Sequence, residues 1–98
     1  MIKEYSTRLQ SSTFQKKRND IDIMSDILKK AKKGAGKTRL MYYCNLSFSQ
    51  IESYLNFLLE IELIAIHPAE QKNRKSYQTT IRGLKFLDTY SQLKILMS

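Results

Sequence analysis

Apolar residues change their spacing along the chain in an order that few folds share. After a polar N-terminal stretch, the apolar positions follow the helical period for about three turns. Asn19 or Asp20 can cap this first helix at its start, and Gly34 is expected to end it. Its buried stripe is predicted to be Ile23, Met24, Ile27, Leu28 and Ala31.

Two further helical segments follow at short intervals. The first runs from about Thr38, which can cap it, to Cys44, and Asn45 is expected to close it because Asn tolerates the left-handed conformation. Ser47 opens the next helix, with Gln50 three residues later in the capping-box pattern. The apolar stripe of this third helix is predicted to be Ile51, Leu55, Leu58 and Leu59.

Beyond residue 62 the pattern is typical of a β-hairpin and a final helix. An apolar run, Leu63–His67, ends at Pro68, and a strand-prone run, Ser76–Thr80, follows a polar and basic tip. Thr80 can cap a last helix from Ile81 to about Met97, which would be roughly 25 Å long. This order predicts an α+β fold of the winged helix-turn-helix type over residues 19–80, with three helices and a two-stranded wing, followed by a C-terminal helix over 81–98.

Three segments resemble a known family: KTRLMYYCNLS (37–47), SYLNFLLEIELIAI (53–66) and YQTTIRGLKFL (77–87). Together they are similar to the archaeal ten-kilodalton winged-helix DNA-binding proteins, first described as Sulfolobus chromatin proteins and grouped with predicted archaeal transcriptional regulators. The resemblance covers about residues 21–90. It implies that the last helix pairs with its mate as an antiparallel coiled coil, which gives an elongated dimer with two DNA-binding heads. The chain departs from the family in a longer N-terminal arm and a shorter C-terminal helix.

The charge balance favours a polyanionic partner. Seventeen Lys and Arg residues face nine Asp and Glu residues, for a formal net charge of +8. Nucleic acid, an anionic membrane and an acidic protein are all compatible with this excess. Residues 1–18 show no sustained period and are interpreted as a basic arm that ends in Lys16, Lys17 and Arg18.

The single cysteine, Cys44, excludes an internal disulfide, and we expect it to be a packed apolar residue. Residues 1–18 contain no continuous apolar stretch of the secretory type, and no run in the chain approaches the length of a membrane span. We therefore expect a cytoplasmic, nucleoid-associated protein that binds no metal and no cofactor.

His67, beside Pro68, is interpreted as a strand-end residue, because no acid or nucleophile is arranged around it. No enzymatic activity and no small-molecule substrate are predicted.

Candidate DNA contacts lie on three predicted elements. On the second helix Lys37 and Arg39 are expected to bind phosphate; the run Gly34–Thr38 resembles the end of a phosphate-binding loop, but Ala31 stands where the full motif has Gly and a helix precedes it. Short polar side chains on the third helix can reach base edges, and cations at the wing tip can contact the backbone. These residues are Ser49, Gln50, Ser53 and Asn56 on the helix, and Lys72, Arg74 and Lys75 in the wing.

The last helix carries two apolar sides, which predicts a second protomer. Phe86, Tyr90, Leu93 and Met97 are spaced by 4, 3 and 4 residues, as in a heptad seam, and are the predicted dimer interface. The other side is expected to pack on its own domain through Ile81, Leu84 and Leu87.

The sequence thus favours a homodimeric protein that binds double-stranded DNA. A transcriptional regulator and a nucleoid-organising protein use the same machinery, and the uncharged face of the third helix inclines the interpretation towards the regulator. The alternative from another class is a protein-interaction module that docks through the acidic third helix and Phe57. Phe57 itself is expected to pack under Tyr54 or the hairpin rather than to meet a thymine methyl group.

Overall fold

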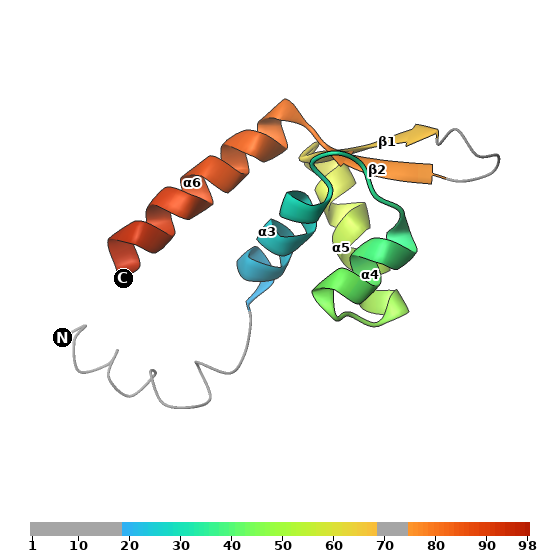
Figure 1. Ribbon diagram of the computed structural model, residues 1–98, viewed down its shortest axis with the longest axis horizontal. Helices are drawn as coiled ribbons and strands as arrows, with labels where there is room; N and C mark the ends of the chain where they lie inside the picture. The colour runs from blue at the N-terminus through green and yellow to red at the C-terminus, as the bar shows by residue number, and fades with distance from the viewer. Residues whose placement is uncertain (1–18, 69–74) are drawn as a thin grey trace.

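The computed structural model describes residues 19–68 and 75–98, which form four helices and one hairpin (Figure 1). The predicted arm, residues 1–18, and the wing-tip residues Lys72 and Arg74 lie outside the described residues. The elements follow the predicted order, with a two-stranded antiparallel sheet between the third and fourth described helices. They are α3 (Asp20–Lys30), α4 (Lys37–Cys44), α5 (Phe48–Glu60), β1 (Ile64–Pro68), β2 (Lys75–Thr79) and α6 (Ile81–Met97).

Helix α3 begins as expected and ends earlier than expected. The side chain of Asn19 accepts a hydrogen bond from the backbone N–H of Asp22 at 2.9 Å, which makes Asn19 the N-cap. The helix stops at Lys30 and does not continue towards Gly34. The reason is tertiary: the carbonyl of Ala31 accepts from the backbone N–H of Gly34 and from that of Thr79, so the chain turns to run beside β2.

The hairpin begins and ends one residue away from the predicted limits. Its strands pair from Ile64 opposite Thr79 to Pro68 opposite Lys75. Thr80 leaves the sheet because its hydroxyl accepts from the N–H of Gly83 and donates to the carbonyl of Glu62, which makes it the N-cap of α6, as predicted.

One core joins all six elements. Its fully buried members come from α3, α4, α5 and β1, and Ala35 reaches β2 through a bridge to Tyr77. Cys44 is 2% exposed and belongs to this core, which confirms its prediction as a packed apolar residue. The largest fully buried side chains are Ile27, Leu28, Leu40, Ile51, Leu55, Leu58 and Ile64.

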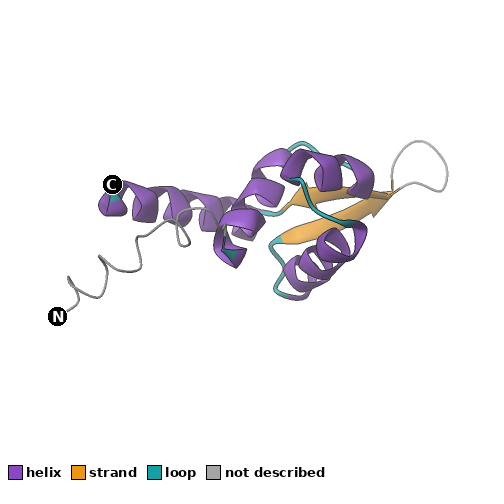
Figure 2. Ribbon diagram, turned by 90° about the horizontal axis from the view of Figure 1, so that it is seen from below, coloured by secondary structure: helices purple, strands orange, loops and turns teal. Residues whose placement is uncertain are grey.

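Helix α6 packs beside α3, and its C-terminal end lies at the opposite end of the molecule from β1 and β2 (Figures 1 and 2). Only Gly83 and Leu87 are buried along it. The expectation that Ile81 and Leu84 pack on their own domain is wrong, because they are 76% and 44% exposed. The closest approach is at Gly83, which lies directly against the carbonyl of Leu63. No helix in the described ranges is long and apolar enough to cross a membrane.

Candidate nucleic-acid interface

Helices α4 and α5 are joined by a tight turn that fixes their relative orientation. Asn45 takes the left-handed conformation at φ 58°, and its N–H and that of Leu46 return to carbonyls of the last turn of α4. Ser47 then caps α5: its hydroxyl accepts from the N–H of Gln50, and the side chain of Gln50 accepts from the N–H of Ser47. Asn45 as the end of α4 and the capping box of Ser47 and Gln50 were both predicted, and both are confirmed. Leu40 and Cys44 pack beneath this turn in the core.

The outward face of α5 is polar and uncharged over its first two turns. The four side chains predicted to reach base edges, Ser49, Gln50, Ser53 and Asn56, are all exposed. Ser49, Ser53 and Asn56 lie opposite the buried stripe of α5, which consists of Ile51, Leu55 and Leu58, and Gln50 lies at its margin. Leu59, also expected in the stripe, is only partly buried. Gln50 also accepts the capping hydrogen bond from Ser47, and the Ser49 hydroxyl lies 3.4 Å from that of Ser47. Among the described residues, the side chains of Ser53 and Asn56 therefore meet a groove without first giving up such contacts.

Lys37 is not a free cation. Its Nζ lies 3.2 Å from Oε2 of Glu52 and above the ring of Phe48, so α4 and α5 are linked across fifteen residues of sequence. The helix starts at Lys37 with Gly36 as N-cap and no side-chain cap, so the expectation that Thr38 caps it is wrong. Because the side chains of Lys37 and Glu52 are both partly accessible, a phosphate can replace Glu52 as the partner of Lys37.

The remaining predicted cations that the structure describes are open to solvent. Arg39 is exposed on α4, and Lys75 is exposed at the first position of β2. Gly34, at φ 97°, leads into the bridge between Ala35 and Tyr77, and α3 precedes it where a phosphate-binding loop needs a strand. His67 pairs with Ser76 near the end of β1, as expected of a strand-end residue.

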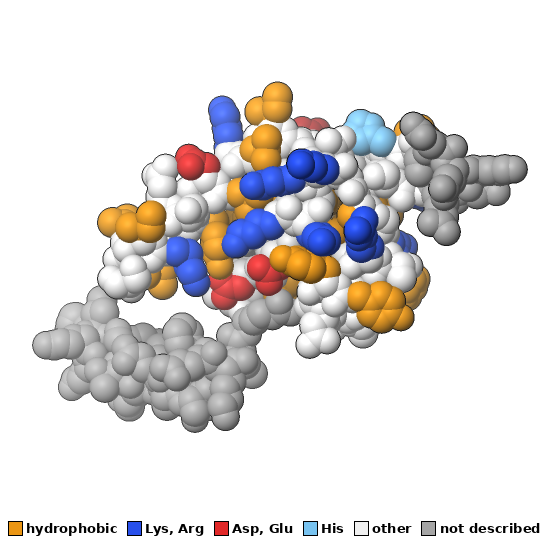
Figure 3. Space-filling view, in the orientation of Figure 1, with side chains coloured by type: hydrophobic (Ala, Val, Ile, Leu, Met, Phe, Trp, Pro, Cys, Tyr) orange, Lys and Arg blue, Asp and Glu red, His pale blue; other side chains and the backbone are white. Residues whose placement is uncertain are grey.

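Sequence reasoning missed a second group of basic side chains, at the junction of α3 with α6 and α4. Figure 3 shows Lys and Arg side chains gathered on the face seen in Figure 1. The ammonium groups of Lys29 and Lys94 both lie over the ring of Tyr90, and that of Lys30 lies over the ring of Tyr43. In sequence the lysines at the end of α3 are explained by the helix dipole alone, and no periodicity pairs them with these rings.

Tyr90 ties α6 to the start of α3. Its hydroxyl donates a hydrogen bond to the carboxylate of Asp22, and this bond raises the pKa of the tyrosine because ionisation would bring two negative charges together. Its ring stacks with that of Phe86 at a centroid distance of 6.5 Å. Phe86 and Tyr90, two members of the predicted dimer seam, are thus already half-buried in their own protomer, whereas Leu93 and Met97 are 49% and 72% exposed.

Residues 17–98 match a family model described as winged helix-turn-helix. The chain belongs to the winged helix-turn-helix family. The fold class predicted from the sequence is thereby confirmed, since the hairpin β1–β2 is the wing and α4 with α5 is the helix-turn-helix.

Solved structures show the same fold. This winged helix-turn-helix protein is similar to Sso10a-2, a DNA-binding protein from Sulfolobus solfataricus, with a TM-score of 0.71 and 23% identity over 82% of each chain. It is similar to MepR of S. aureus in a complex with DNA, with a TM-score of 0.72 and 16% identity over 98% of this chain and 83% of that one. It is also similar to smu.1704 of Streptococcus mutans, with a TM-score of 0.72 and 17% identity over 81% of each chain.

The resemblance to the Sulfolobus proteins, inferred from three sequence segments, is therefore confirmed at the level of the fold. A search of curated proteins gives no match. Among the described residues of this winged helix-turn-helix protein, no group of three or more His, Cys, Asp or Glu side chains is placed to hold a metal ion.

Proposed function

We propose that this winged helix-turn-helix protein is a transcriptional regulator that binds double-stranded DNA as a homodimer. Residues 19–80 form the DNA-binding head, and residues 81–98 form the dimerisation helix. The observation that carries the proposal is the uncharged, exposed face of α5, held by a capped turn that follows α4, the helix that carries the exposed Arg39. Such a helix fits the major groove, where short amide and hydroxyl groups distinguish base pairs.

Two kinds of solved relative support the proposal. Sso10a-2 is described as a DNA-binding protein, and MepR was solved in a complex with DNA. In the proposed complex, α5 enters the major groove and the phosphate contacts come from α4 and the wing. The cations assigned to these contacts are Lys37, Arg39, Lys72, Arg74 and Lys75.

Removing cations that bind phosphate is expected to weaken binding to every duplex by a similar factor. Replacing Arg39 and Lys75 together with Ala should lower the slope of log affinity against log salt by about one unit for each phosphate that is no longer bound. The measurement is a titration of a fluorescent duplex at several salt concentrations.

The matched control is the pair Lys29→Ala and Lys94→Ala, which removes the same charge from the surface over Tyr90. This control should leave the salt slope near that of the parent. If the two double variants lower the slope equally, α4 and the wing are not the DNA-binding face. If the affinity of the parent for the duplex does not depend on salt, docking of a protein on α5 and Phe57 becomes the better interpretation.

Base readout is expected to depend on Asn56, which is exposed in the middle of the α5 face. Replacing it with Ala should cost about 1–3 kcal/mol of discrimination at one base pair and little affinity for random DNA. Selection from a random duplex library, followed by competition against random DNA, measures both quantities. Gln92→Ala, an exposed amide on α6, is the control and should change neither. Equal losses of Asn56→Ala on selected and random DNA would mean that α5 only positions the protein.

A further inference from the structure

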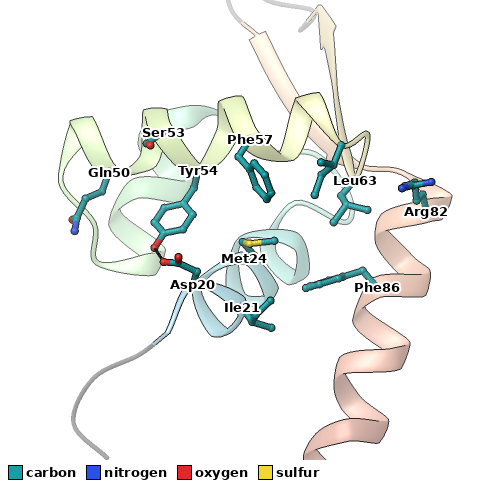
Figure 4. Close-up of a pocket in the computed structure, with 11 residues that line it drawn as sticks. Asp20, Ile21, Met24, Gln50, Ser53, Tyr54, Phe57, Leu63, Arg82 and Phe86 are labelled. Atoms are coloured by element: carbon teal, nitrogen blue, oxygen red, sulfur yellow. Dashed lines mark hydrogen bonds between the residues drawn. The ribbon is translucent and has the colours of Figure 1, made fainter. Parts of the chain in front are cut away.

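A cavity of about 920 Å³ lies between α3, α5 and α6, next to the proposed DNA-reading face (Figure 4). Its middle is apolar, and Figure 4 shows side chains from all three helices directed towards one space. These are Ile21 and Met24 from α3, Phe57 from α5 and Phe86 from α6, with Leu63 at the base. Phe57 and Ile21 are 46% and 44% exposed, so the described chain leaves much of this apolar surface uncovered.

The two ends of the cavity differ in charge. At one end the carboxylate of Asp20 accepts a hydrogen bond of 2.6 Å from the hydroxyl of Tyr54, so that its charge already has a partner. At the other end stands Arg82, which is exposed and has no hydrogen bond or ion pair among the described residues. A guanidinium beside an apolar cavity is matched by a planar anion, which it can bind through two parallel hydrogen bonds.

We propose that this cavity binds small amphipathic carboxylates, whose acid group meets Arg82 and whose ring system lies between Phe57 and Phe86. The volume is within the range of cavities that hold organic ligands. Two aromatic walls add stacking contacts to the burial of apolar surface.

A second copy of the chain fits the cavity less well. Among the described residues, a run of exposed apolar side chains lies at the end of α6, in residues 93–97. Residues 89–98 contain one cation, Lys94, and no Asp or Glu, so this helix end would bring a like charge towards Arg82 and leave the guanidinium unpaired. A carboxylate ligand satisfies both the apolar walls and the cation.

Binding in the cavity also bears on DNA, and this part rests on the proposed function. Gln50 and Ser53 line the cavity and belong to the exposed face of α5 that is assigned to base readout. A ligand that contacts them withdraws two of the four side chains from the DNA. The site therefore regulates the protein negatively: the bound carboxylate lowers affinity for duplex.

The first test uses binding without DNA. Isothermal titration of the full chain with biphenyl-4-carboxylate should give saturable binding. The neutral amide of the same shape should bind with an affinity at least about tenfold lower. Arg82→Gln, at an exposed position, should remove the difference between acid and amide, and Phe57→Ala should weaken both. Lys85→Gln, which removes a neighbouring exposed cation on the same helix outside the cavity, should change neither.

Three results would overturn the site: no binding of the carboxylate at millimolar concentration, equal binding of acid and amide by the parent, or equal effects of Arg82→Gln and Lys85→Gln. Dissociation of a dimer by Phe57→Asp, with no binding of the acid to the parent, would assign the cavity to a second copy.

The second test repeats the DNA titration with saturating biphenyl-4-carboxylate, which should lower affinity for the duplex at least severalfold. Ligand binding by a protein that binds no duplex would refute the proposed function and leave the site intact, whereas unchanged DNA affinity would refute the regulation alone.

Discussion

Replacing Leu93 with Asp is expected to convert the protein from a dimer to a monomer and to lower its DNA affinity by about 100-fold or more. An isolated protomer exposes an unusual amount of apolar surface along α6, at Ile81, Leu84, Leu93, Ile95, Leu96 and Met97. A second α6 can cover the side that carries Leu93, Leu96 and Met97. A charge placed in the covered seam would be buried without a partner, which costs several kcal/mol. The affinity falls because two linked heads profit from a high effective concentration on one duplex and a single head does not.

Sedimentation of the parent and the variant decides this prediction. Ser91→Asp is the matched control, since it adds the same charge two residues away and on the other side of the helix from Leu93. The control should remain a dimer. If Ser91→Asp dissociates the protein and Leu93→Asp does not, the interface lies on the side of Ile81, Leu84 and Ile95 and the heptad seam is wrong. A parent that sediments as a monomer would remove the dimer from the proposed function.

Replacing Gly83 with Ala is expected to destabilise the fold by about 2 kcal/mol. A Cβ at this position would lie 2.2 Å from the carbonyl oxygen of Leu63 and 2.6 Å from Cγ2 of Thr79. Backbone cannot move aside as a flexible side chain does, so overpacking costs about 3 kcal/mol, which the better helix propensity of Ala offsets by at most about 1 kcal/mol. For a domain of this size the melting temperature should fall by about 10 °C.

Thermal unfolding followed by circular dichroism measures this change. Gly36→Ala is the control, because a Cβ there meets only the carbonyl of Lys75, at 3.8 Å, and φ is −81°, which any residue adopts. Its cost should stay within about 1 kcal/mol, as for the loss of a weak N-cap. A Gly83→Ala variant that melts with the parent would contradict the close packing of α6 on Leu63.

Features that depend on neighbours within a few residues could be predicted from the sequence. The caps at Asn45, Ser47 and Thr80 depend on hydrogen bonds between residues close in sequence, and each was predicted at the right residue; the cap of α3 is Asn19, one of the two residues that the sequence allowed. The periods of the apolar residues then gave the order of helices and strands, and that order specifies the winged helix-turn-helix fold.

The partner that each side chain contacts depends on the packing of the whole domain. Periodicity assigned Ile81, Leu84 and Leu87 to the side of α6 that the domain covers, but only Leu87 is buried. Phe86 instead packs against the core and Tyr90 contacts α3, because the covered side depends on how the helix crosses its neighbours. The pairing of Lys37 with Glu52 and the cavity beside Arg82 likewise join residues far apart in sequence. Local patterns carry no information about such contacts, since the distance between two helices is set by everything that packs between them.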